Sequence, residues 1–117
     1  ENVQTLDISS GVVTIDLSLG QSFELEIDED VDRFTLLNPP SGATAFSVKL
    51  TQNSTGGYGV GIDTFRNSGG NAIPVYWPAG GVLPIVTTTA SKTDIYSFKT
   101  FDGGSSLYGV VGGQNFA

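Results

Sequence analysis

The stretch GVVTIDLSLGQSFELEID, residues 11–28, contains two runs in which apolar and polar side chains alternate. Apolar residues stand at every second position from Val13 to Leu19 and again from Phe23 to Ile27. Because successive side chains of a strand point to opposite faces, this period of two predicts two half-buried β-strands. Gly20 and Gln21 separate the runs, so we expect the two strands to pair as a hairpin.

Short runs of the same kind continue along the chain and are separated by glycine and proline, while no helical pattern is evident. The last two runs lie on either side of the turn at 102–104. They are expected to form a buried hairpin, with its first strand in a central position of the sheet. About eight or nine short strands predict an all-β fold, an antiparallel, jelly-roll-like β-sandwich in a single domain, residues 1–117. Further strands are expected at 34–36, 46–51, 58–62, 73–77, 82–90, 94–101 and 107–111.

The composition excludes several classes of partner and chemistry. Twelve acidic and five basic residues give a net charge of -7, which repels nucleic acid and anionic lipid. Apolar runs are far shorter than the roughly 18 residues of a membrane span, so membrane insertion is not expected. The chain contains neither cysteine nor histidine, which removes disulfides, the usual zinc ligands and the common nucleophilic triads. No cofactor is expected.

Four patterns follow one another along nearly the whole chain: IDLSLGQSFEL (15–25), FTLLNPPSG (34–42), FSVKLTQNSTGG (46–57) and WPAGGVLPIVTTTASKTDIYSFKTFDGGSSLYGVVGGQNF (77–116). In this order they resemble a module of tailed-phage virion proteins, especially of marine and cyanobacterial phages. That module commonly closes tail fibres, tail spikes and related appendages, often on a Gly-Gln-Asn-Phe terminus. The resemblance implies a place on the virion exterior, other virion proteins as partners, and a role in assembly and host-surface attachment. The glycine-rich stretch 58–76 departs from the family, so its surface detail is not carried over.

Two other roles stay open beside the tail-fibre role. A capsid decoration protein would clamp shell subunits, and a stand-alone carbohydrate-binding module would act as a lectin. Self-association as a homotrimer is expected, because phage appendages commonly impose threefold contacts and because Gly59, Gly61, Gly109 and Gly112 would leave bare faces for close approach. The chain begins at Glu1 without methionine, so a processed protein or part of a longer one is expected.

An acidic segment offers one weak ion site. Asp28, Asp30 and Asp32 place carboxylates at alternate positions, as at the opening of a calcium-binding loop. Arg33 stands where that loop needs glycine, and Pro39 where it needs a bidentate glutamate. The favoured interpretation is an acidic hairpin turn, and a bound cation is the alternative.

Aromatic residues offer a possible receptor surface, because an aromatic face accepts the C–H edges of a sugar. Tyr76 and Trp77 are neighbours in an extended segment and should point to opposite faces, so at most one is a sugar platform. Core packing is the favoured interpretation of Trp77. The residues considered for this surface are Tyr58, Phe65, Tyr76 and Trp77, with Tyr108 as a further aromatic.

No catalytic role is expected. A glycoside hydrolase needs two carboxyl groups held roughly 5 to 10 Å apart in a cleft, one of them with a raised pKa. Outside the early strands the chain offers Asp63, Asp94 and Asp102, each at a strand end or in a turn. A local hydrogen bond to the backbone is the ordinary explanation for an aspartate in such a place.

Overall fold

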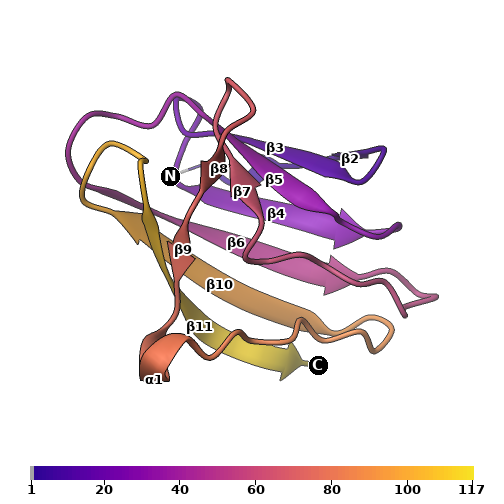
Figure 1. Ribbon diagram of the computed structural model, residues 1–117. Helices are drawn as coiled ribbons and strands as arrows, with labels where there is room; N and C mark the ends of the chain where they lie inside the picture. The colour runs from indigo at the N-terminus through magenta and orange to yellow at the C-terminus, as the bar shows by residue number, and fades with distance from the viewer. Residues whose placement is uncertain (1) are drawn as a thin grey trace.

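A computed structural model describes residues 2–117 and shows an almost entirely β chain whose two sheets pack against each other in one compact unit (Figure 1). The first sheet has the strand order β1-β4-β6-β10-β11-β9, and the second has the order β2-β3-β5-β7-β8. The elements are β1 (Gln4–Thr5), β2 (Ile8–Ser9), β3 (Val12–Asp16), β4 (Ser22–Ile27), β5 (Arg33–Leu37), β6 (Thr44–Gln52), β7 (Phe65–Arg66), β8 (Ala72–Ile73), β9 (Val75–Tyr76), α1 (Pro78–Gly81), β10 (Thr93–Thr100) and β11 (Leu107–Phe116).

The first half of the chain winds back and forth between the sheets. Strands β3, β5 and β7 lie in the second sheet, while β4 and β6 lie in the first. As a result β5 returns beside β3, β6 beside β4, and β7 beside β5, each pair running parallel. Parallel neighbours need a long crossover connection, and here a strand of the opposite sheet provides it.

The pairing corrects two predictions of hairpins and does not confirm the antiparallel, jelly-roll detail of the predicted fold. The expected hairpin over Gly20 and Gln21 is wrong, because β3 and β4 belong to different sheets. The acidic segment after Ile27 is likewise a connection between sheets and not a hairpin turn. Both sheets are mixed, with five parallel and four antiparallel strand pairs within residues 2–117, whereas a jelly roll is built from antiparallel Greek keys.

Three local expectations also fail. No strand forms over 58–62, where Val60 makes a single bridge to Val31, and none forms over 82–90. The turn α1 stands where no helix was expected, although Ala79 has a left-handed φ of 58° and interrupts regular helical geometry. Proline at the start of α1 and glycine at its end suit one isolated turn.

The C-terminal hairpin is confirmed. Strands β10 and β11 pair antiparallel, and β10 also pairs with β6 along its full length, which gives it the expected central position. Gly103 and Gly104 turn the chain with positive φ angles of 71° and 91°, a region that glycine enters without steric cost. The Thr100 hydroxyl accepts a hydrogen bond from the Gly104 N–H at 2.9 Å and so fixes the turn.

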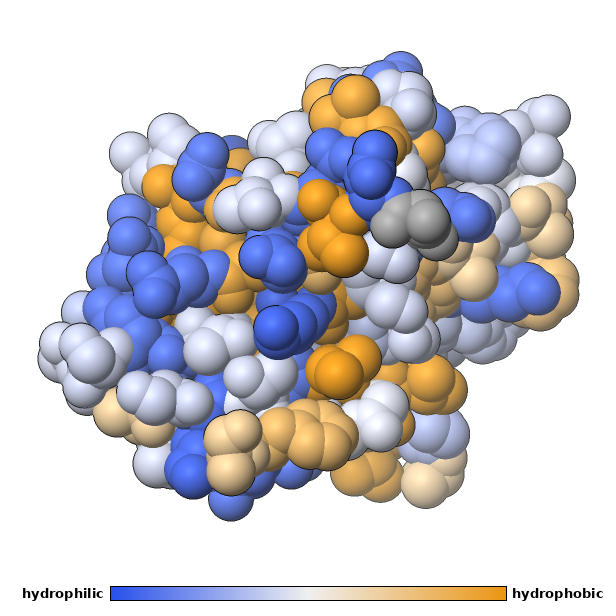
Figure 2. All heavy atoms as spheres, turned by 180° about the vertical axis from the view of Figure 1, so that it is seen from behind, coloured by the Kyte–Doolittle hydropathy of each residue, from blue (hydrophilic) through white to orange (hydrophobic). Residues whose placement is uncertain are grey.

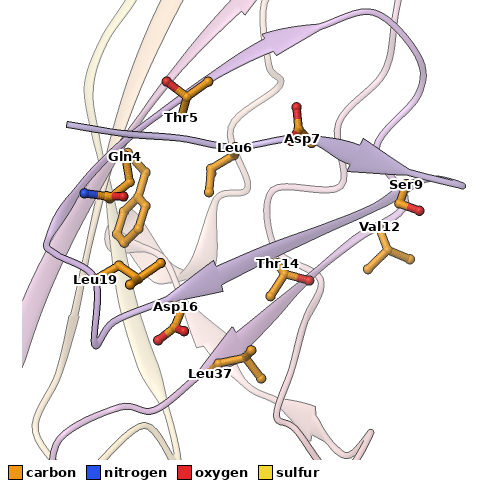
Figure 3. A pocket seen from close by; sticks show the side chains of 11 residues that line it. Gln4, Thr5, Leu6, Asp7, Ser9, Val12, Thr14, Asp16, Leu19 and Leu37 are labelled. Atoms are coloured by element: carbon orange, nitrogen blue, oxygen red, sulfur yellow. The ribbon is translucent and has the colours of Figure 1, made fainter.

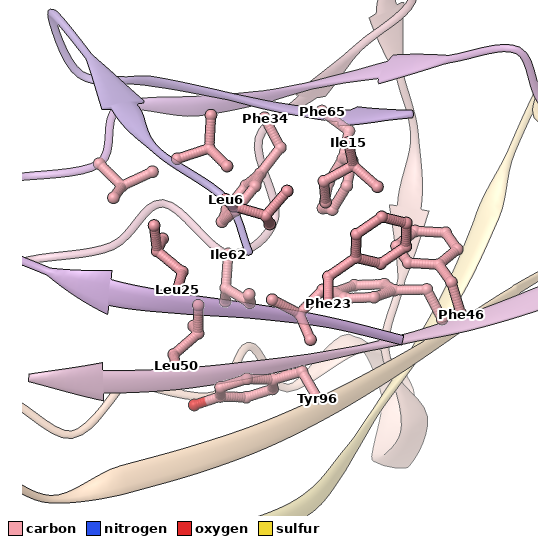
Figure 4. Close-up of a cluster of buried hydrophobic side chains, with 14 of the residues drawn as sticks. Leu6, Ile15, Phe23, Leu25, Phe34, Phe46, Leu50, Ile62, Phe65 and Tyr96 are labelled. Carbon is pink, nitrogen blue, oxygen red and sulfur yellow. The ribbon is translucent and has the colours of Figure 1, made fainter. Parts of the chain in front are cut away.

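The core lies between the sheets and contains a group of aromatic rings, part of which Figure 4 shows. Phe65 of β7 stacks on Phe34 of β5 at 5.1 Å between ring centroids. The same ring meets Phe98 of the first sheet at 5.0 Å, and Phe98 stacks on Phe46 at 5.2 Å. Each such pair contributes about 0.5 to 1.5 kcal/mol beyond the burial of its surface. The contact between Phe65 and Phe98 is the one of these that joins the two sheets.

Trp77 fills the core where the last strands meet, and Gly109 of β11 makes room for it. The Trp77 side chain is 8% exposed, and its ring lies edge-on to Phe98 at 5.8 Å. A Cβ atom at Gly109 would lie 2.6 Å from Cζ3 of the indole. A side chain therefore cannot be added at Gly109 unless the indole shifts.

Gly109→Ala is expected to lower the free energy of unfolding by about 1 to 3 kcal/mol, because it overpacks a filled core. Gly59→Ala is the matched control, since a Cβ there would have no neighbour within 4 Å. Urea unfolding of both variants measures the difference. Equal midpoints for the two variants would contradict this account of Gly109.

Candidate functional site

The structure separates the aromatic residues that were considered for a receptor surface. Phe65 is 2% exposed and Trp77 8% exposed, so both belong to the core and neither is a surface contact. Tyr58 is partly buried and packs against the core. Tyr76 is 51% exposed, on the opposite side of its strand from Trp77, as the alternation predicts.

Tyr76 lies in a surface formed by three strands, which we call the aromatic surface: Tyr76, Lys99, Phe101 and Tyr108. The Tyr76 and Tyr108 ring centroids lie 5.4 Å apart, and those of Phe101 and Tyr108 lie 5.9 Å apart. The Nζ atom of Lys99 lies 5.1 Å from the centroid of the Phe101 ring. About half or more of each ring residue is exposed, at 51% for Tyr76, 63% for Phe101 and 50% for Tyr108.

Strand register brings these residues together on the outer face of the first sheet. Tyr108 lies opposite Tyr76 in the β11–β9 pair and opposite Lys99 in the β10–β11 pair. The next residue of β11, Gly109, faces inward against Trp77. Alternation therefore directs Tyr108 outward, and it does the same for Lys99 because Phe98 is in the core.

Hydroxyl groups adjoin the aromatic surface on the same face of the sheet. Ser47 of β6 and Ser97 of β10 lie opposite each other, and their Oγ atoms form a hydrogen bond of 2.8 Å. Ser97 in turn lies opposite Val110 of β11. The rings are not coplanar, since Tyr76 and Tyr108 are tilted by 39° and Phe101 and Tyr108 meet edge-on at 78°. An exposed ring beside hydroxyl groups can stack on the apolar face of a sugar while the hydroxyls hydrogen-bond its edge.

A groove of about 440 Å³ lies elsewhere, where the N-terminal segment passes over β3 and β4 (Figure 3). Leu6, Phe23 and Leu37 contribute apolar side chains to it. Its two carboxylates do not act as a pair, because Figure 3 shows the Asp7 carboxylate pointing away from Asp16. Hydrogen bonds from the Ser18 hydroxyl at 2.6 Å and the Asn38 amide at 2.9 Å hold the pKa of Asp16 below its ordinary value.

The acidic segment joins two parts of the backbone. Asp30 accepts a hydrogen bond from the Gly59 N–H at 2.9 Å, and Val31 is 3% exposed and pairs with Val60. Asp32 continues the segment, and its N–H donates to the Gly11 carbonyl at 2.7 Å. Within residues 2–117 no three or more aspartate or glutamate side chains are grouped so that they could hold a metal ion, and Asp28, Asp30 and Asp32 are not brought together in such a group.

The later aspartates have structural partners. Asp102 accepts hydrogen bonds from Thr100 at 2.9 Å and from the Ser106 hydroxyl at 2.7 Å, which lower its pKa and brace the hairpin turn. Asp63 is exposed and makes a 3.4 Å contact with the Thr64 hydroxyl. These contacts match the local role that the sequence predicts for aspartates in turns.

Asp94 is different, because its side chain is 1% exposed and holds three segments together. One carboxylate oxygen accepts from the Thr87 N–H and the Tyr96 hydroxyl, each at 2.8 Å, and the other accepts from the Asn115 N–H at 2.8 Å. The Gln114 amide donates to the Tyr96 hydroxyl at 2.8 Å and to the Ile85 carbonyl at 2.7 Å. The end of β11 and the segment before β10 are thereby fixed to β10.

Two opposing effects act on the Asp94 pKa. Burial disfavours the charged carboxylate and raises the pKa, whereas the N–H donors of Thr87 and Asn115 and the Tyr96 hydroxyl lower it. The hydrogen bonds outweigh the burial, so the pKa lies below its ordinary value. Burial first, and then the negative charge of Asp94, raise the pKa of Tyr96, which stays a neutral donor.

Asp94→Asn is expected to reduce the free energy of unfolding by about 1.5 to 3 kcal/mol at pH 7, because the charged acceptor of several hydrogen bonds is lost. A carboxylate with a lowered pKa stabilises the fold above the unfolded value of about 3.9, and that stability is lost as pH falls through the folded pKa. The difference between wild type and variant should therefore shrink at acidic pH.

Urea titrations from pH 7 downward measure this difference. Asp63→Asn is the control, since the Asp63 side chain is exposed and should show a small effect at every pH. A difference between wild type and Asp94→Asn that stays constant down to acidic pH would contradict the role of the charge.

No helix in residues 2–117 is long and apolar enough to cross a membrane. Comparisons with models of protein families, with curated proteins and with solved structures find no match to this chain. The aromatic surface, and not a relative, is therefore the starting point for assigning a function.

Proposed function

We propose that this domain is a non-catalytic β-sandwich module on the exterior of a tailed bacteriophage, and that the aromatic surface attaches it to a host-surface glycan. The observation that carries the proposal is the row of Tyr76, Tyr108 and Phe101, whose exposed rings lie within 6 Å of their neighbours. Exposed aromatic residues that cluster on one face commonly mark a site of contact.

The chemistry of the surface suits a saccharide. The ring faces present negative charge density to the C–H groups of a pyranose, and the tyrosine hydroxyls can donate or accept hydrogen bonds at its edge. Lys99 adds a flexible donor beside Phe101. The rings lie on the outer face of a sheet, which suits an extended chain of sugars more than a small molecule that is enclosed on all sides.

The location on the virion and the protein partners are proposed from the resemblance of the four sequence patterns to the module of tailed-phage virion proteins. The module would contact other virion proteins and assemble as a homotrimer in a tail fibre or related appendage. Three of the four glycines that were expected to leave bare faces for a second copy are instead covered by their own chain. A Cβ at Gly61, Gly109 or Gly112 would approach Asp32, Trp77 or Ile95, respectively. Of the four glycines, Gly59 alone would leave a Cβ without a neighbour. Self-association therefore needs another surface.

Tyr76→Ala and Tyr108→Ala are each expected to weaken binding to host surface polysaccharide by about tenfold or more, because each removes a stacking ring. Both side chains are half exposed, so the melting temperature should change little. Isothermal calorimetry with purified polysaccharide measures the affinity.

Leu19→Ala is the matched control, because Leu19 is a 61% exposed apolar residue that lines the separate groove. Binding that is lost in Leu19→Ala but kept in the tyrosine variants would move the glycan site to the groove. Binding that none of the variants changes would overturn the glycan proposal.

Electron microscopy of labelled particles tests the place on the virion. Label on the tail appendages is the expected result, and label spread over the capsid would favour a decoration protein instead. No label on particles would overturn the virion assignment while leaving the glycan measurement intact.

A further inference from the structure

The charged residues are unevenly distributed along this acidic chain. No aspartate, glutamate, lysine or arginine occurs in 67–91 or in 103–117, although the whole chain has twelve acidic and five basic residues. These two uncharged segments contribute most of the large apolar side chains that reach the surface. Figure 2 shows hydrophobic residues at its lower right. Because that view is turned by half a rotation, this side is the lower left of Figure 1, where α1 lies.

Part of this uncharged side forms what we call the apolar ridge: Val82, Leu83, Ile85 and Val111. The first three follow α1 and are 66%, 46% and 85% exposed, and Val111 is 41% exposed. Val111 lies opposite the buried Tyr96 and therefore on the inner side of β11, away from Tyr108. The apolar ridge and the aromatic surface thus flank the same strand on different sides.

The backbone of the apolar ridge is anchored although its side chains are exposed. The Val82 N–H donates to the Pro78 carbonyl at 3.2 Å, and the Ile85 carbonyl accepts from Gln114 at 2.7 Å. Val86 is 5% exposed and packs in the core, and the Thr87 N–H bonds to Asp94. A surface that is already ordered loses little conformational entropy when a partner binds.

Strand β11 also offers an edge beside the apolar ridge. It pairs with β9 only at Leu107 and Tyr108, and its remaining residues pair only with β10. An edge of this kind is usually covered by another element or protected by charge. Residues 109–116 contain no charge to protect it.

We propose that the apolar ridge is the contact between copies of this chain. Two molecules with a net charge of -7 repel each other, and the repulsion is smallest where uncharged surfaces meet. An apolar strip can pack against its own copy without burying an unpaired charge, which would be costly. This inference rests on the proposed self-association and identifies the surface that makes it.

The arrangement has a consequence for attachment. Three apolar ridges around a threefold axis would bury Val82, Leu83 and Ile85 and leave the aromatic surfaces on the outer side of each first sheet. Several binding surfaces on one assembly raise the overall affinity for a repetitive polysaccharide without any new contact. Self-association would then strengthen the glycan attachment.

Ile85→Lys tests the contact, because it adds a charge to the most exposed side chain of the apolar ridge. Light scattering coupled to size-exclusion chromatography should show an oligomer for wild type and monomer for Ile85→Lys at the same concentration. Leu19→Lys is the matched control and should remain oligomeric. Tyr108→Ala should also remain oligomeric, since it lies on the aromatic surface.

Single-cysteine variants give an independent readout, because the natural sequence contains no cysteine. Ile85→Cys should give covalent dimers with a short bis-maleimide crosslinker, since each subunit then has one thiol, whereas Leu19→Cys should not. An oligomer that survives Ile85→Lys, with no crosslinking of Ile85→Cys, would overturn the apolar ridge as the contact but keep self-association. Wild type that stays monomeric at all concentrations would overturn both, and the glycan measurements would stand separately.

Discussion

The ring of Phe65 is the contact on which the packing of the two sheets depends. It touches Phe34 of its own sheet at 5.1 Å and both Phe98 and Phe46 of the other, at 5.0 and 6.4 Å. Its strand, β7, has only two residues, so side-chain burial and not a long hydrogen-bonded ladder holds it in place. Because β3 to β7 alternate between the sheets, neither sheet is continuous in sequence. Each sheet can therefore form only together with the other and with the core between them.

The alternation of apolar residues predicts which side chains are buried, but it does not predict which strands pair. Val13, Ile15, Phe23 and Leu25 are all buried, as the period of two requires. The predicted run extends too far, because β3 ends at Asp16 and Leu19 is 61% exposed. The same period results whether the next strand lies alongside in one sheet or crosses to the other, so the sequence does not distinguish a hairpin from a crossing. The C-terminal hairpin was predictable because its turn has a chemical signature of its own, with glycines at two left-handed positions.

The candidate site was predictable only in part for the same reason. Neighbouring positions in an extended segment predict that Tyr76 and Trp77 face opposite ways, and the structure confirms it. Alternation along β10 also places Phe101 on the side of Lys99, a signal that could have identified it. The short distance between Phe101 and Tyr108 depends on the register of β10 and β11. The short distance between Tyr76 and Tyr108 depends on the parallel pairing of β9 with β11, two segments far apart in the sequence. The burial of Phe65 follows from the contact between the sheets, which no local pattern contains.

Strand β11 links the stability of this domain to both of its proposed surfaces. Tyr108 faces outward in the aromatic surface, while the next residue, Gly109, faces inward and admits the Trp77 ring. Farther along, Gln114 holds the Ile85 carbonyl and the Tyr96 hydroxyl, so the apolar ridge is fixed to the same strand. A substitution that shifts β11 would therefore move both surfaces at once. Substitutions in the outward-facing positions of β3 to β5 need only preserve the alternation that fills the core, because those strands carry neither surface.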